Sequence, residues 1–250
     1  YLSSKDCDLC DKRQVELLFE KYQPTTVIHL AAKVGGILQN INQPAVFFDQ
    51  NIRMNTNVLV TSKEYGVENF LSVLSTCMYP NVVSKYPMTE DDIHLGPPAA
   101  ANFSYAYTKR CMAVQIDAYN KQYGLKYNYL IPCNLYGEYD NFLDSNKSHF
   151  VTALIKKILD AEKQNKKEIT LFGTGKPMRQ FMYAGDLAMV IKNSIDKSIK
   201  DSFNVAPPEQ NYSIEEMAIM ALRNLAKEDW KIIYDSSKPD GQFRKDVSCE

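Results

Sequence analysis

The sequence lacks the features that mark several large classes of protein. Its formal net charge is only -1 over 250 residues, with no basic stripe and no acidic tail, so we expect no nucleic acid as a partner. No apolar run approaches the roughly 20 residues that a membrane helix needs, and we expect neither a membrane location nor a signal peptide. With 45% hydrophobic and 24% charged residues, the composition is that of a globular chain with a large core.

Cysteine is present but sparse, and its spacing suits no disulfide framework. The six cysteines are Cys7, Cys10, Cys77, Cys111, Cys133 and Cys249. The pair Cys7-x-x-Cys10 has no second pair to complete a zinc site, so we assign no metal. We expect free thiols, and from them a cytoplasmic location.

A phosphate-binding glycine loop is also missing. The sequence has no G-x-G-x-x-G, and "GTGK" at 173–176 fails the P-loop pattern because Thr170 and Pro177 stand where Gly and Ser/Thr are required. We interpret "GTGKP" as a turn after a strand.

What the sequence does contain is an alternation of short apolar strands and periodic helices. Ser213 and Glu216 form a capping box at the start of one predicted helix. The other predicted helices span 44–66, 103–123, 148–164 and 184–197, and the predicted strands span 27–32, 69–75, 126–133, 168–173, 202–206 and 230–235. Such alternation predicts an α/β fold with a doubly wound parallel sheet, which binds ligands beyond the carboxyl ends of its strands.

One polar constellation coincides with such a strand end. Tyr105 and Lys109 are spaced i, i+4 and share a helix face. A lysine beside a phenol is expected to lower the tyrosine pKa, and such a tyrosine exchanges a proton with an alcohol or ketone oxygen. A chance surface pair is the common alternative for this spacing, but Ser75, at the end of the preceding strand, favours a catalytic set.

Several longer blocks extend this pattern. With "VIHLAA" (27–32) upstream, the strand-end serine and Y-x-x-x-K resemble the extended short-chain dehydrogenase/reductases. Within them, the sequence is similar to the GDP-L-fucose synthase family over "AAKVGGI" (31–37), "STCMYP" (75–80), "PCNLYGEYDNF" (132–142), "GTGKPMRQF" (173–181) and "SKPDGQFRK" (237–245). The family's first strand with its glycine loop and the last stretch of its C-terminal lobe have no counterpart, so we expect the chain to be a fragment.

The resemblance implies a Rossmann-type lobe that binds NADP(H) and a smaller α/β lobe that binds a GDP-linked sugar nucleotide. The first would comprise 1–137 and about 180–207, and the second about 138–179 and 208–250. A homodimer is implied as well. The implied reaction converts GDP-4-keto-6-deoxy-D-mannose to GDP-L-fucose by epimerisation at C3 and C5 followed by NADPH-dependent reduction at C4.

The resemblance also assigns roles to residues. The implied catalytic residues are Ser75, Cys77, Tyr105, Lys109 and His149, with Cys77 and His149 as the acid/base pair for epimerisation. Those implied at the cofactor are Asp8, Leu9, Ala31, Ala32, Tyr105, Lys109 and Pro132, and those at the substrate are Asn134, Lys157, Arg179, Lys238 and Arg244. Asn57 resembles an asparagine that supports the helix carrying Tyr105.

Blander interpretations stand beside these roles. Without the resemblance, Cys77 is more typical of a buried small side chain. His149 has an alternative as the polar start of a helix, and Lys157 and Arg244 have one as surface charges. Another NAD(P)-dependent sugar-nucleotide epimerase or dehydratase is the nearest alternative function. A catalytically silent nucleotide-binding module is the other, because the glycine loop is absent. The residues present leave NADP and NAD undistinguished.

Overall fold

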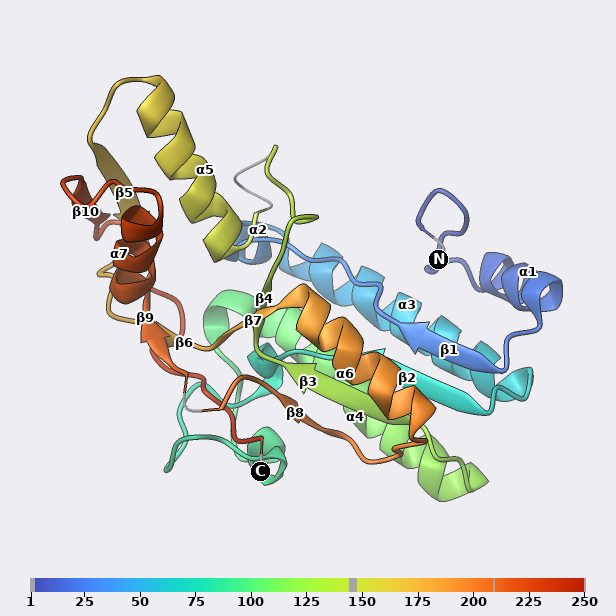
Figure 1. Ribbon diagram of the computed structural model, residues 1–250. Coiled ribbons are helices and arrows are strands. Elements are labelled where there is room, and N and C mark those ends of the chain that lie inside the picture. Colours follow the sequence, from blue (N-terminus) through green and yellow to red (C-terminus); the bar gives the residue numbers. More distant parts are fainter. Residues whose placement is uncertain (1–2, 144–147, 209, 250) are drawn as a thin grey trace.

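A four-stranded parallel sheet forms the centre of the molecule in the computed structural model, which describes residues 3–143, 148–208 and 210–249. Its strands are β1 (Thr26–His29), β2 (Asn69–Val73), β3 (Asn128–Pro132) and β8 (Phe203–Val205), in the order β1-β2-β3-β8 (Figure 1). All three pairings are parallel. The predicted α/β fold with a doubly wound parallel sheet is therefore confirmed.

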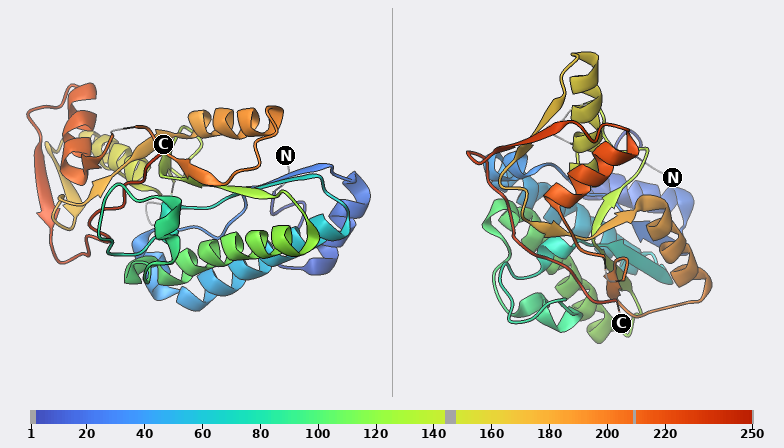
Figure 2. Two further views of the ribbon diagram at one scale, coloured as in Figure 1. Left: turned by 90° about the horizontal axis from the view of Figure 1, so that it is seen from below. Right: turned by 60° about the vertical axis from the view of Figure 1, so that its left-hand side comes forward.

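Helices cover both faces of this sheet. Figure 2 shows α3 (Pro44–Glu64) and α4 (Phe103–Tyr123) on one face and α6 (Ala184–Asp196) on the other. Two apolar clusters lie between these layers. One joins Leu59 of α3 and Ile116 of α4 to Phe70, and the other joins Leu187 and Leu130. Alternate residues of a strand point to opposite faces, which is why adjacent Phe70 and Leu71 belong to different clusters.

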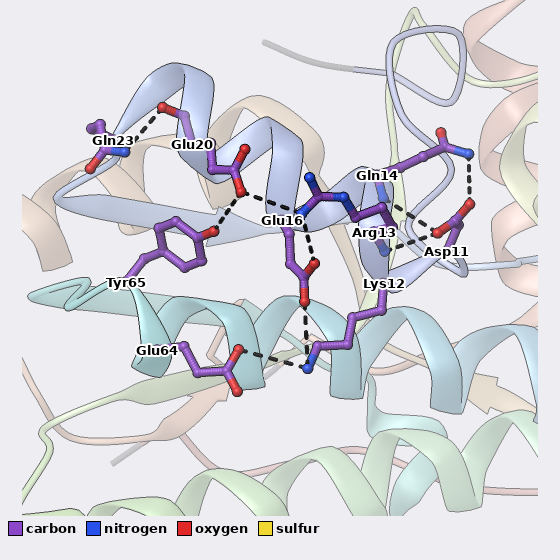
Figure 3. Close-up of polar contacts among 9 residues, drawn as sticks. All are labelled: Asp11, Lys12, Arg13, Gln14, Glu16, Glu20, Gln23, Glu64 and Tyr65. Atoms are coloured by element: carbon purple, nitrogen blue, oxygen red, sulfur yellow. Dashed lines mark hydrogen bonds and ion pairs between the residues drawn. The ribbon is translucent and has the colours of Figure 1, made fainter.

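Helix α1 (Lys12–Tyr22) was not among the predicted elements. Asp11 caps it, its side chain accepting from the backbone N–H groups of Arg13 and Gln14. Val15 and Phe19 bury its apolar face. Lys12 bridges to Glu64 of α3 at 3.8 Å, and Figure 3 shows this pair within a surface network of charges. Exposed ion pairs of this kind contribute little, so the apolar face is what holds α1.

A smaller unit with its own apolar cluster lies at one end of the sheet. Its parallel strands are β5 (Glu168–Phe172) and β10 (Lys231–Asp235), packed on α5 (Phe150–Lys163) and α7 (Ile214–Asn224). Two short strand pairs complete the described strands: β4 (Asn134–Tyr136) with β7 (Phe181–Tyr183), and β6 (Met178–Arg179) with β9 (Tyr212–Ser213). In Figure 1 this unit stands at the left, away from α1.

Short helical turns connect these elements. They are α2 (Ile37–Asn42) and the 3-10 turns η1 (Thr76–Met78), η2 (Glu90–His94) and η3 (Ala100–Asn102). The predicted "GTGKP" turn is confirmed, since Gly173 and Gly175 both take φ of 76° directly after β5. The predicted capping box of α7 is also confirmed: Ser213 accepts from Glu216 N, and the Glu216 carboxylate accepts from Ser213 N.

The structure also bears on the expectations for the cysteines, for Asn57 and for membrane-spanning helices. All six cysteines are free thiols. Asn57 donates to the Leu9 carbonyl oxygen at 2.9 Å, so its predicted support of the Tyr105 helix is wrong. Asn55 takes that place, with its amide 3.4 Å from the Thr108 carbonyl oxygen of α4. In the part of the chain that the structure describes, no helix combines the length and hydropathy needed to cross a bilayer.

Candidate active site

Ser75 and Cys77 stand on one turn at the carboxyl end of β2. Ser75 is the N-cap of η1, and its hydroxyl oxygen accepts a hydrogen bond from the Cys77 backbone N–H at 3.2 Å. The preceding residue, Leu74, is tied to β3 by a 2.8 Å bond to the Leu130 carbonyl oxygen. The turn therefore starts from a fixed strand end and holds both side chains, which are half-buried.

Tyr105 and Lys109 reach the same place from the first turns of α4. The Lys109 ammonium donates to the Val73 carbonyl oxygen at 2.8 Å and lies 5.7 Å from the centroid of the Tyr105 ring. Ser75 and Cys77 both act on the pKa of Tyr105. The structure thus brings together four of the five predicted catalytic residues.

The expected lowering of the Tyr105 pKa is wrong. Burial raises the pKa of Tyr105 and the Cys77 charge raises it further, against a smaller opposing effect of the hydrogen bond with Ser75. The Lys109 ammonium donates its hydrogen bond to the Val73 carbonyl oxygen, and burial lowers the pKa of Lys109 to about 8. Tyr105 is therefore a phenol that keeps its proton at neutral pH, which suits a proton donor.

Two basic side chains approach the Cys77 thiol. The Lys245 ammonium lies 3.5 Å from the Cys77 Sγ, and Arg179 of β6 contributes a positive charge. Lys245 was missed by the sequence-based assignment, which chose the neighbouring Arg244. The block "SKPDGQFRK" ends on Lys245, so the signal was present in the sequence, but nothing local singles out which basic residue faces inward.

His149, the fifth predicted catalytic residue, has a different polar contact. It is the N-cap residue of α5, and its Nδ1 lies 3.2 Å from the Asp140 Oδ1. Asp140 also accepts from the Thr152 hydroxyl at 2.6 Å. The ring is therefore oriented by a carboxylate that is itself held, an arrangement common to histidines that exchange protons.

The predicted substrate residues are dispersed. Asn134 donates its side-chain amide to the Gln180 carbonyl oxygen at 2.8 Å, so it joins β4 to the segment before β7. Lys157 donates to the Thr170 carbonyl oxygen at 2.7 Å and lies 4.4 Å from the Phe172 ring centroid. Both side chains therefore already make bonds within the chain, and among the predicted substrate residues only Arg179 acts on the Cys77 thiol.

Lys238 and Arg244 lie in the segment after β10. Lys238 is exposed. Arg244 forms a two-pronged ion pair with Asp246, with distances of 2.5 and 2.9 Å, and its guanidinium lies 4.8 Å from the centroid of the Tyr86 ring. The carboxylate raises the pKa of Arg244. Arg244 is thus paired with a carboxylate of the same chain, whereas Lys238 is exposed to solvent.

Three of the predicted cofactor residues lie at the carboxyl ends of strands. Ala31 and Ala32 follow β1, and Pro132 ends β3. Asp8 is exposed, with one carboxylate oxygen accepting from the Cys10 N–H. Backbone at the ends of the strands, an acidic side chain that can accept from ribose hydroxyls and the Lys109 ammonium as a donor are groups that fit a dinucleotide in a sheet of this type. Among the described residues, no group of three His, Cys, Asp or Glu side chains could hold a metal.

Comparison with known proteins agrees with this geometry. Residues 3–206 match the model of the NAD dependent epimerase/dehydratase family. The chain belongs to that family. A GDP-L-fucose synthase from Dictyostelium discoideum is 40% identical to it over 250 residues, which cover 99% of this chain and 77% of that protein.

Other similar proteins support the same placement. A GDP-L-colitose synthase from Yersinia pseudotuberculosis is 37% identical over 245 residues, 97% of this chain and 79% of that protein. Among solved structures, a GDP-L-fucose synthetase from Naegleria fowleri bound to NADP superposes with a TM-score of 0.87 at 35% identity, over 99% of this chain and 75% of that one. Family membership and fold therefore agree between the sequence and the structure comparisons.

Proposed function

We propose that this chain converts GDP-4-keto-6-deoxy-D-mannose to GDP-L-fucose, by epimerisation at C3 and C5 and then reduction at C4 with NADPH. The observation that carries the proposal is the single turn that presents Ser75 and Cys77 beside Tyr105 and Lys109. A keto-reductase needs Ser75, Tyr105 and Lys109. Only a reaction that also exchanges protons at carbon needs a thiol among them, which argues against a simple 4-epimerase.

The ketone oxygen is held by Ser75 and Tyr105 in this proposal. Two hydroxyl donors aimed at one oxygen stabilise the negative charge that develops there, whether it belongs to an enolate or to an alkoxide. The raised pKa of Tyr105 keeps its proton in place until the alkoxide forms. One oxyanion site therefore serves both the epimerisation and the reduction.

Cys77 exchanges protons at the carbons beside that ketone. Burial raises the pKa of the thiol, but the charge of Lys245, the hydrogen bond with Ser75 and the charge of Arg179 together bring it below its ordinary value. A thiol titrating nearer to neutrality is a competent base and acid. His149 is proposed as the second acid/base group, and its bond to Asp140 supports that role.

NADP(H) is the proposed cofactor, and it supplies a hydride for C4 when bound. Asp8 and Leu9 would hold its adenosine end, and Ala31, Ala32 and Pro132 would line its path along the strand ends. Lys109, with Tyr105, would meet its nicotinamide ribose. The similar structure from Naegleria fowleri is bound to NADP, which supports this choice over NAD.

The sugar nucleotide would be held through its charges. Arg179 is the strongest candidate for the diphosphate, since a guanidinium binds phosphate oxygens with two parallel bonds. Lys238 offers an exposed ammonium. Asn134, Lys157 and Arg244 would have to exchange a bond they already make within the chain, so their proposed roles are secondary.

Three further expectations remain proposals. A homodimer through α3 and α4 is supported by exposed apolar side chains on both helices, among them Phe48 and Phe103. The division into an NADP-binding lobe and a substrate lobe is supported by the separate apolar cluster of α5, β5 and α7. A cytoplasmic location is proposed from the free thiols alone.

The proposal is tested by supplying a protein that contains this chain with the 4-keto sugar nucleotide and NADPH. We expect loss of NADPH absorbance, two non-exchangeable deuteriums in product made in D2O, and a sugar with the GDP-L-fucose NMR spectrum. NADPH consumption with no deuterium at C3 or C5 would reduce the chain to a 4-reductase. A product with the colitose spectrum from the corresponding dideoxy substrate, at higher kcat/KM, would change the substrate and keep the chemistry.

A further inference from the structure

The segment after β10 is held in place from two sides. Its described residues, 236–249, contain no helix and form a single β-bridge. The isolated bridge joins Val247 to Met88 of the central unit. On the opposite side, the Gln180 side chain both donates to and accepts from the Val247 backbone, at 3.2 and 2.9 Å. Val247 itself is buried. This segment, residues 242–248, therefore has a fixed position between the two units.

Further bonds fix its earlier residues. The Gln242 side-chain amide donates to the Pro80 carbonyl oxygen at 3.0 Å, three residues after Cys77. The Phe243 carbonyl oxygen accepts from the Met178 N–H at 2.8 Å, next to Arg179. Tyr86 donates to the Arg244 carbonyl oxygen at 3.1 Å. Residues on both sides of position 245 are thus tied to the loop that follows the catalytic turn and to strand β6.

The fixed segment 242–248 places Lys245 beside the Cys77 thiol. Its side chain is 9% exposed, and its ammonium lies 3.5 Å from Cys77 Sγ across 168 residues of sequence. Within residues 3–143, 148–208 and 210–249, no carboxylate forms an ion pair with it. A buried ammonium is unfavourable unless a negative group compensates it. The Cys77 sulfur, as thiolate, is the acceptor with which this ammonium forms a hydrogen bond.

The other charged and titratable groups around Cys77 come from two elements. Tyr105 and Lys109 approach from α4 and Arg179 from β6. Burial lowers the pKa of Lys245, and the like charge of Arg179 lowers it further. Among the cations near the sulfur, Lys245 exerts the largest effect and makes the hydrogen bond. Lys109 and Arg179 both donate to backbone carbonyl oxygens instead.

We propose that Lys245 is a positioning residue that holds Cys77 as a thiolate, ready to take a proton from the carbon beside the substrate ketone. The inference rests on the proposed function. In the step it serves, the C–H bond breaks, its proton forms S–H on Cys77, and its electron pair moves into the enolate whose oxygen Ser75 and Tyr105 hold. The carbon then gains a proton on its opposite face from His149, the second acid/base group of the proposed function, which takes a proton from solvent in its turn, and Cys77 returns its proton to solvent. Lys245 keeps all three of its protons throughout.

The first test is the pH dependence of Cys77 alkylation by iodoacetamide, followed peptide by peptide in the full chain without substrate. Only the thiolate reacts. We expect Lys245→Met to move the midpoint upward by at least about one pH unit, which is about a tenfold loss of alkylation rate on the low-pH side. Lys245→Arg keeps the positive charge, so its Cys77 alkylation midpoint should stay close to that of the wild type. Lys176→Met, which removes an exposed lysine of the neighbouring turn, is the matched control.

The wild-type chain supplies a second comparison that needs no variant. Cys111 is also half-buried, but burial raises its pKa. Cys77 should therefore be alkylated at lower pH than Cys111. Equal midpoints for the two thiols, or an unmoved Cys77 midpoint in Lys245→Met, would overturn the proposal and leave Lys245 as a ligand for the substrate's phosphates. If Lys245→Met does not fold, the wild-type comparison still decides.

Substrate kinetics separate this proposal from the proposed function. Lys245→Met should slow deuterium uptake at C3 and C5 at saturating substrate about tenfold or more and leave KM within about threefold, since the change acts through Cys77. A phosphate ligand would instead raise KM with kcat retained, and that result overturns the inference. A low Cys77 midpoint that depends on Lys245, without any exchange in wild type, would sustain the Lys245–Cys77 pair and refute the proposed function.

Discussion

The Lys109 ammonium donates a 2.8 Å hydrogen bond to the carbonyl oxygen of Val73, the last residue of β2. Ser75 follows two residues later, and Tyr105 lies one turn before Lys109 on α4. A single buried lysine therefore ties the helix that carries the phenol to the strand end that carries the serine. The relative position of the two oxygen-binding hydroxyls depends on this bond.

We expect Lys109→Met to impair both proposed half-reactions, because both use the oxygen held by Ser75 and Tyr105. Loss of the bond frees the strand end and leaves the Val73 carbonyl oxygen without that donor, which costs about 1–3 kcal/mol. NADPH oxidation and deuterium uptake should fall together by at least about tenfold. Lys121→Met, at an exposed position near the end of α4, is the control, and a loss confined to one half-reaction would contradict the shared site.

Tyr105→Phe should abolish most NADPH oxidation while GDP binding stays intact. Removal of the phenol proton leaves the alkoxide at C4 without its donor, a contribution of about 10²–10⁴ in rate for a positioned acid. Tyr107→Phe on the same helix removes a hydroxyl but keeps the ring that contacts Phe103, and it should retain turnover. Near-normal reduction by Tyr105→Phe would remove Tyr105 from the proposed mechanism.

Cys77→Ser and Ser75→Ala should fail in different ways. A hydroxyl at position 77 has a pKa far above neutrality, so proton exchange at C3 and C5 should slow by orders of magnitude while hydride transfer to C4 continues. The product should then be a sugar that is not fully epimerised. Ser75→Ala should slow both steps, since both need the polarised ketone.

The two activities are followed in one sample as deuterium uptake from D2O and NADPH oxidation. Cys111→Ser, at a half-buried position of α4, is the control for a thiol with no proposed role. Deuterium uptake at the wild-type rate in Cys77→Ser would return Cys77 to its interpretation as a small buried side chain.

His29 should make the fold sensitive to acid. It is 4% exposed in β1, hydrogen-bonded to Asn55, and burial lowers its pKa from 6.5 to about 4. Between these two values the unfolded chain binds a proton that the folded chain does not, so the free energy of unfolding falls as pH drops from 6.5 to 4. The full shift corresponds to about 3 kcal/mol.

Urea unfolding at stepped pH measures this effect. His29→Gln retains a side chain able to bond Asn55 and should flatten the slope between pH 6.5 and 4. His94→Gln, at an exposed position in η2, should leave the slope as it is. A slope unchanged in His29→Gln would show that another group carries the acid sensitivity.

Local sequence determined most of the architecture. Strand and helix periodicity, the Ser213–Glu216 capping box and the "GTGKP" turn depend on residues within a few positions of one another, so their physics is legible in one stretch of chain. The same holds for Tyr105 and Lys109 on one helix face. Helix α1 escaped prediction because its apolar stripe is narrow: within it, the structure buries only Val15 and Phe19.

Only the tertiary structure decided what surrounds the reactive groups. Lys245 meets Cys77 across 168 residues, Arg244 turns instead to Asp246, and no pattern in "FRKD" distinguishes the two basic residues. The pKa of Tyr105 rises because burial outweighs the nearby lysine, whose ammonium bonds the Val73 carbonyl oxygen. Spacing along a chain fixes which side chains share an element, whereas desolvation and the choice among hydrogen-bond partners depend on every element packed against them.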